Sequence, residues 1–209
     1  CGVSVTLVDE GASPGGHLRA VTRPLAGLRE WAGLPGCEAV GRMAAELDGL
    51  PNVSIWSGAS ALGVYEDNLV GVLKGRRFIQ IRTRHLLVAT GSYEQPLLFH
   101  NNDLPGVFLS RGLLKLMNLQ GVLPGRRALV YGSHVEALAV ACELLDAGVR
   151  VVGVAGPVCG LPEGGEEWRR LRDARVSLFP GWTLAEAGGR NRVESARLIR
   201  PASGPAGGP

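Results

Sequence analysis

The sequence is poor in the residues that would indicate redox-disulfide or metal chemistry. Its 209 residues include four cysteines and no C-x-x-C pair. The four are Cys1, Cys37, Cys142 and Cys159. Such spacing argues against a disulfide-exchange centre and against a metal or iron–sulfur site. We therefore expect no bound metal. We also expect the thiols to be reduced and the protein to be cytoplasmic.

Long apolar runs and strong charge are also absent. No apolar run approaches the roughly 20 residues that a membrane span needs. The net charge is only +3 and is spread along the chain, so the sequence shows no basic cluster that would bind nucleic acid. No Ser/His/Asp arrangement or carboxylate pair stands out, so hydrolytic chemistry has no support. We expect neither a nucleic-acid partner nor a membrane span.

Strand-like and helix-like patterns alternate on both sides of a group of short strands. Strands are predicted at Val3–Asp9, Val53–Trp56, Ala59–Tyr65, Leu69–Leu73, Phe78–Arg82, His85–Gly91, Arg127–Tyr131, Val149–Val154 and Val193–Ile199. Helices are predicted at Cys37–Leu50, Ser110–Gln120, His134–Ala147 and Glu166–Arg175. The strand at His85–Gly91 is expected to be buried.

This alternation predicts an α/β fold with two Rossmann-like, three-layer dinucleotide-binding units and a small antiparallel β meander. Residues 1–122 form a partial FAD- or dinucleotide-binding domain that includes the meander. Residues 123–200 form a second, NAD(P)-type Rossmann-like domain. Residues 201–209 are rich in glycine and proline and are expected to be a disordered tail.

The first candidate site follows the strand Val3–Asp9. In a dinucleotide-binding βαβ unit, an acidic residue closes the second strand and hydrogen-bonds the ribose hydroxyls. Asp9 and Glu10 stand at that place, although an acidic pair at a strand end can also be merely solvated. Gly15 and Gly16 follow, and glycines let a backbone approach a cofactor closely. We predict that these four residues contact a dinucleotide.

The second candidate is Ala89-Thr90-Gly91, where a predicted strand runs into a glycine turn. Small residues and free amides there suit a pyrophosphate or an adenosine, but any tight turn after a strand can use the same residues. Its position after a strand meander favours the cofactor interpretation.

The order of these motifs resembles the glutathione-reductase-like flavoproteins with two dinucleotide-binding domains. More narrowly, residues 89–107 resemble the α subunit of heterotetrameric sarcosine oxidase and dye-linked proline dehydrogenases. The resemblance covers roughly residues 3–155 and is specific only in 89–107. It implies an FAD site, or NAD in the first site, and a flavin-binding partner subunit in a hetero-oligomer.

The sequence departs from this family at its start. The family begins with a strand and a G-x-G-x-x-G turn whose helix holds the pyrophosphate, and no such turn precedes Val3. We expect the first unit to lack its N-terminal βα element and the chain to be truncated at both ends. A sheet without that strand would leave unpaired backbone and an exposed apolar face.

The second unit departs from the dinucleotide pattern as well. Gly132 and Ala137 fit the pattern, but His134 replaces the glycine that would let the backbone approach a pyrophosphate. The next predicted strand ends in Val154-Ala-Gly-Pro157, without an acidic ribose partner or an arginine for a 2′-phosphate. We retain Gly132 as a candidate cofactor residue and favour a unit kept for packing or subunit contact.

The leading functional hypothesis is an FAD-dependent, or NAD-binding, oxidoreductase subunit in a complex that oxidises a secondary amine or amino acid of the sarcosine or proline type. One alternative is a stand-alone NAD(P)H-dependent flavin oxidoreductase. Another is a non-catalytic nucleotide-binding or structural subunit. No residue is assigned as a catalytic acid or base.

Overall fold

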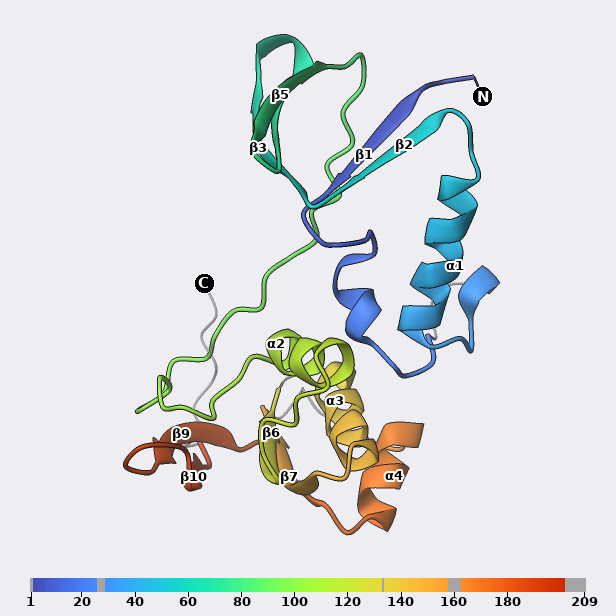
Figure 1. Cartoon of the computed structure of the whole chain (residues 1–209). Coiled ribbons are helices and arrows are strands. Elements are labelled where there is room, and N and C mark those ends of the chain that lie inside the picture. The colour runs from blue at the N-terminus through green and yellow to red at the C-terminus, as the bar shows by residue number, and fades with distance from the viewer. Residues whose placement is uncertain (1, 26–28, 133, 158–162, 202–209) are drawn as a thin grey trace. The chain divides into compact units, whose positions relative to one another are not determined.

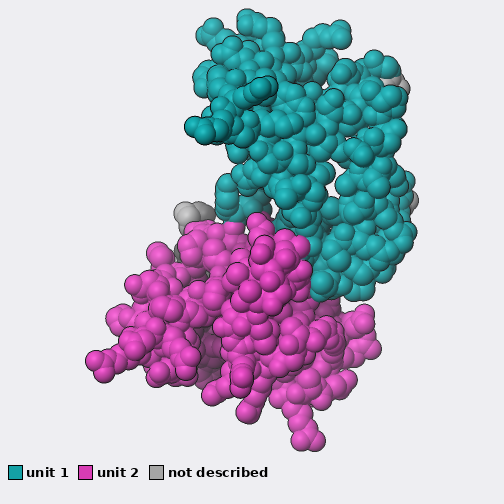
Figure 2. Space-filling model, viewed as in Figure 1, with its two compact units in different colours: residues 1–93 teal, residues 94–209 magenta. Residues whose placement is uncertain are grey.

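The computed structural model describes residues 2–25, 29–132, 134–157 and 163–201. The chain divides into two compact units, residues 1–93 and 94–209, which Figure 2 colours separately. Domains at 1–122 and 123–200 stay a prediction. The predicted disordered tail lies outside the described residues, apart from Pro201.

The first unit contains a short parallel sheet with a helical connection. Strand β1 (Val5–Asp9) pairs in parallel with β2 (Val53–Ser57), so that Asp9 lies opposite Ser57. Between them come the 3₁₀ turns η1 (Gly16–Ala20) and η2 (Arg29–Trp31) and the helix α1 (Gly36–Asp48). Figure 1 shows α1 beside the β1–β2 pair. The loop 10–16 therefore begins directly at the end of β1, after Asp9.

An antiparallel meander follows in the same unit, as the sequence predicts. Its strands are β3 (Ala59–Tyr65), β4 (Leu69–Lys74) and β5 (Arg77–Arg82), in the order β3-β4-β5, with the 3₁₀ turn η3 (Glu66–Asn68). The alternating side chains Ala59, Val70 and Val72 are buried, and Val8 and Trp56 pack against them. The meander and the parallel pair therefore share one small core.

The predicted buried strand at His85–Gly91 is wrong. These residues form no strand; the side chains of Leu87 and Val88 are 89% and 68% exposed. A strand needs a paired neighbour, and residues 85–91 pair with none of the strands that the structure describes. Apolar content alone thus does not make this segment a strand. The expected unpaired backbone and exposed apolar residues are present here.

The second unit is built on a three-stranded parallel sheet. Strands β6 (Arg127–Tyr131), β7 (Arg150–Gly156) and β8 (Ser177–Pro180) lie in the order β6-β7-β8. Helices α3 (Val135–Asp146) and α4 (Glu166–Asp173) connect them. Eight consecutive residues of α3, from Ala137 to Leu144, are buried. Strand β8 was not predicted from the sequence.

Two further elements complete the second unit. Helix α2 (Ser110–Leu114) continues into the π-helical turn η4 (Lys115–Leu119). Strands β9 (Thr183–Gly188) and β10 (Ser195–Ile199) form an antiparallel pair, of which β9 was not predicted. Before α2, His100 forms an isolated parallel β-bridge with Glu186 of β9.

The α/β class and its mixture of parallel and antiparallel sheets are as predicted. Among the described residues, no helix combines the length and the apolar character needed to cross a membrane.

Candidate dinucleotide-binding site

Asp9 ends β1 and already uses one of its carboxylate oxygens. Its Oδ1 accepts the Gly11 N–H at 2.7 Å, which closes a tight turn directly after the strand. Its Oδ2 forms no hydrogen bond or ion pair with any residue that the structure describes. The turn therefore fixes the carboxylate and leaves an acceptor for a ligand hydroxyl, which is the requirement for a ribose partner.

The loop after Asp9 is held to the neighbouring strand and turns on two glycines. The Gly11 carbonyl accepts the Gly58 N–H at 2.8 Å, just beyond the end of β2. Gly15 and Gly16 have φ values of 119° and 54°, which side chains rarely adopt. The loop therefore keeps a conformation that depends on glycine.

The two glycines differ in their surroundings. A Cβ at Gly15 would clash with the Val40 side chain of α1, whereas a Cβ at Gly16 would meet nothing within 4 Å. Gly15 thus lets the loop pack on α1. Gly16 leaves open space on an exposed surface, where a cofactor has room to approach.

The other predicted residues of the first unit are exposed. Glu10 lies beside Asp9 on the surface, and Ala89, Thr90 and Gly91 lie in the extended segment after the meander. Gly91 has a φ of 73°, and a Cβ there would meet nothing within 4 Å. Within the described part of the chain, no hydrogen bond joins residues 89–91 to the Asp9 loop. Their part in one site with Asp9 stays a prediction.

Gly132 lies in the second unit, at the end of β6. Its N–H donates to the Ala155 carbonyl at 3.0 Å, and a Cβ there would lie 2.7 Å from the Ala137 Cβ. The glycine is therefore needed for close packing between the strand and α3. This geometry accounts for Gly132 without a ligand, and a cofactor role stays a prediction.

The described surface carries open hollows, among them one at the Asp9 loop and one on α4. One, of about 380 Å³, borders the Asp9 loop and is lined by Pro14, Ala44, Ala45, Asp48, Ile55 and Ser57. Ser57 is the register partner of Asp9, although Asp9 itself is not among the lining residues. Its lining is mixed, because Ala44, Ala45 and Ile55 are apolar whereas Asp48 and Ser57 are polar.

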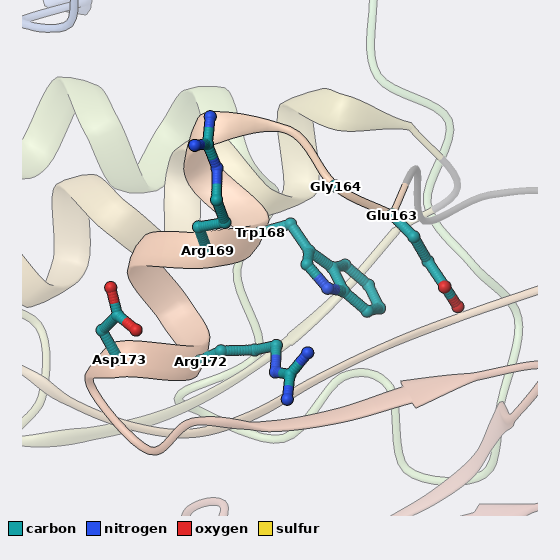
Figure 3. A pocket seen from close by; sticks show the side chains of 6 residues that line it. All are labelled: Glu163, Gly164, Trp168, Arg169, Arg172 and Asp173. Carbon is teal, nitrogen blue, oxygen red and sulfur yellow. The ribbon is translucent and has the colours of Figure 1, made fainter.

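The other hollow lies on α4 and has a different character. It measures about 500 Å³ and is lined by Glu163, Gly164, Trp168, Arg169, Arg172 and Asp173. Figure 3 shows Trp168 and Arg172 extending to the same side of the helix, while Arg169 extends to another. Charges of both signs alternate around it, and Gly132 is not among its lining residues. It therefore gives no support to a cofactor at Gly132.

The chain is similar in sequence to subunits of known oxidases. No protein-family model matches it. The sarcosine oxidase α subunit of Rhizobium meliloti (strain 1021) is 30% identical over 224 aligned residues, covering 97% of the chain and 22% of that protein. An opine oxidase subunit of Agrobacterium tumefaciens (strain Ach5) is 27% identical over 157 residues, 71% of the chain and 31% of that protein. The predicted resemblance is confirmed.

Solved structures agree on the fold. L-proline dehydrogenase from P. horikoshii matches with a TM-score of 0.71 and 25% identity over 94% of the chain and 35% of that protein. Thioredoxin reductase from Lactococcus lactis matches with a TM-score of 0.68 and 16% identity over 95% of the chain and 64% of that protein. The chain has the Rossmann-like fold of FAD/NAD(P)-binding oxidoreductases. It spans between 16% and 33% of the length of the curated relatives that it matches.

Proposed function

We propose that this chain is the dinucleotide-binding part of an FAD-dependent oxidoreductase subunit that acts on a secondary amine or amino acid, of the sarcosine or proline type. The observation that carries the proposal is the similarity along 97% of the chain to a sarcosine oxidase α subunit. Opine oxidase and L-proline dehydrogenase are further relatives whose names describe amine or amino-acid substrates.

The residues of the first unit fit the ribose end of FAD. Asp9 offers a fixed carboxylate with one free oxygen, and Gly16 leaves open space on the same loop. Asp9 and Glu10 would hold the ribose, while Gly15, Gly16 and residues 89–91 would line the dinucleotide. NAD offers the same adenosine half and is the alternative occupant of this site.

The chemistry of the reaction would come from the cofactor rather than from this chain. Bound FAD would supply the hydride acceptor for oxidation at the carbon next to the amine nitrogen. The residues of this chain bind and orient the adenosine half, and none of them is placed as a proton donor or acceptor. Gly132 would act in packing the second unit.

A partner subunit belongs to the proposal. The similar proteins are each named as one subunit of a larger enzyme, namely sarcosine oxidase, opine oxidase and hydrogen cyanide synthase. We propose that this chain works in a hetero-oligomer with a flavin-binding partner. A cytoplasmic location is part of the same proposal.

An absorbance scan of the protein purified with its partner tests this function. We expect flavin bands that sarcosine, proline or another secondary amine bleaches and that NAD(P)H does not. Bands bleached by NAD(P)H alone would instead support a stand-alone flavin reductase. A colourless complex that binds no nucleotide by calorimetry would overturn the proposal in favour of a structural subunit.

A further inference from the structure

Arg19 lies on the same loop as the proposed ribose site, and the dinucleotide motif does not account for it. It belongs to η1 and is half-buried. The next residues, Ala20 and Val21, are only 2% and 6% exposed. Because its neighbours in the chain are anchored in the core, the backbone of Arg19 has a fixed place beside the loop.

The side chain of Arg19 runs along the glycines of that loop. Its Cγ lies 3.2 Å from the position that a Gly15 Cβ would take, and its Nη1 lies 3.6 Å from the corresponding position at Gly11. The Asp9 Oδ1 lies 2.9 Å from that same Gly11 position. The guanidinium and the Asp9 carboxylate are therefore neighbours on one side of the loop.

The two groups do not neutralise each other. No ion pair or hydrogen bond joins Arg19 to Asp9, or to any other residue that the structure describes. A guanidinium has five N–H donors in a planar fork, which matches the oxygens of a phosphate. A half-buried cation without a partner among the described residues offers donors to a phosphate, and the neighbouring carboxylate oxygen offers an acceptor to a ribose hydroxyl.

We propose that Arg19 binds a phosphate of the dinucleotide whose ribose Asp9 holds. The ribose hydroxyls go to the carboxylate and the phosphate, attached to the same sugar, goes to the guanidinium. This inference rests on the proposed dinucleotide site. It adds a specificity-determining cation on the described chain to a site whose other members are a carboxylate and glycines.

Calorimetry with adenosine and ADP tests the proposal, since ADP is the half that FAD and NAD share and adenosine lacks the phosphates. The variants are Arg19→Gln, Arg19→Lys and, as a matched loss of one positive charge elsewhere on the same unit, Arg77→Gln. Arg77 is exposed at the start of β5. Thermal unfolding of each full-length variant checks that the loop change leaves the fold intact.

We expect Arg19→Gln to weaken ADP binding about tenfold and to leave adenosine binding within about twofold. Arg19→Lys should lose less, and Arg77→Gln should match the original chain. Equal ADP affinity in Arg19→Gln and the original chain would overturn the phosphate role. A parallel loss of adenosine and ADP binding would also overturn it, because Arg19 would then only support the loop.

The outcomes separate this inference from the proposed function. If the original chain binds neither adenosine nor ADP, the proposed dinucleotide site fails and the role of Arg19 fails with it. If the original chain binds both ligands and the Arg19 variants bind them equally well, the site stands and Arg19 has no part in it.

Discussion

Gly15 and Gly16 show how two adjacent glycines of one loop serve different physical ends. Both have positive φ, but only at Gly15 would a side chain also clash with Val40. Gly15→Ala should therefore cost about 2–4 kcal/mol of unfolding free energy, from strain and overpacking together. Gly16→Ala should cost about 1–2 kcal/mol, from the backbone conformation alone.

Urea denaturation of both variants, followed by fluorescence, measures this difference. Equal losses at the two positions would mean that the loop does not pack on α1 as described. A Gly16→Ala variant that keeps its stability but loses dinucleotide binding would place the cofactor against that glycine.

The two described cysteines should differ sharply in reactivity. Cys37 is exposed, whereas Cys142 is buried in α3. Burial raises the pKa of the Cys142 thiol, and the positive charge of Arg170 only partly offsets this. Because the thiolate is the reactive form, Cys142 should react on the order of tenfold or more slowly with iodoacetamide at pH 8.

Peptide mapping of labelled protein gives the two rates separately, and denaturant should bring them together. Rapid labelling of Cys142 in the folded chain would show that α3 is not packed as described.

At the scale of elements, the Glu94 carboxylate caps the N-terminus of α2 from sixteen residues before it in the sequence. Both oxygens of Glu94 accept backbone N–H groups of this helix, from Ser110 at 3.1 Å and Arg111 at 2.8 Å, and the Ser110 hydroxyl also donates to it. A carboxylate at a helix N-terminus satisfies free donors and complements the helix dipole. Glu94→Gln should destabilise the second unit by about 1 kcal/mol.

Hydrogen exchange at residues 110–114 tests this capping role, with Glu66→Gln on the meander as a control for the loss of one acidic charge. Faster exchange in the Glu94 variant alone is expected. Unchanged protection of α2 would contradict the capping role.

The elements that could be predicted from the sequence are those whose residues meet their partners nearby. The meander strands supply their own small core through Ala59, Val70 and Val72, and α3 is buried over eight consecutive residues. The segment 85–91 failed because a parallel strand depends on a neighbour that its own residues do not encode. Strand β8 has only four residues, and β9 has the sequence TLAEAG, which is poor in β-branched and aromatic residues, so both patterns are weak.

The same distinction holds for the site. Asp9 and the glycine loop were predictable, because a strand end, an acidic residue and glycines follow one another in the sequence. The role of Gly15 in packing against Val40 could not be predicted, because α1 lies more than twenty residues further on. The role of Arg19 could not be predicted, because its side chain comes near Asp9 only through the fold of the loop between them.

At the scale of the whole chain, the segment 86–93, which connects the two units, should be the first site of proteolysis. Residues 86–91 form no backbone hydrogen bond with the described residues, and Tyr93 is 98% exposed. Chymotrypsin cleaves after aromatic residues and needs an extended, accessible chain. Brief digestion should therefore cut after Tyr93 and give fragments of residues 1–93 and 94–209.

Mass spectrometry of the early fragments identifies the first cut. First cleavage at Tyr65 or Tyr131, with Tyr93 protected, would mean that the segment is covered or paired in solution.

The central claim, that Asp9 holds the ribose of a dinucleotide, is tested most directly by titrating FAD into the chain and into its Asp9→Ala variant. The account predicts saturable binding that weakens about tenfold or more in the variant, because a charged hydrogen-bond acceptor for the ribose is lost. Asp9→Asn, which keeps an acceptor for the Gly11 N–H, controls for the turn and should lose less. FAD binding of equal strength in Asp9→Ala and the original chain, or no FAD binding at all, would contradict the claim.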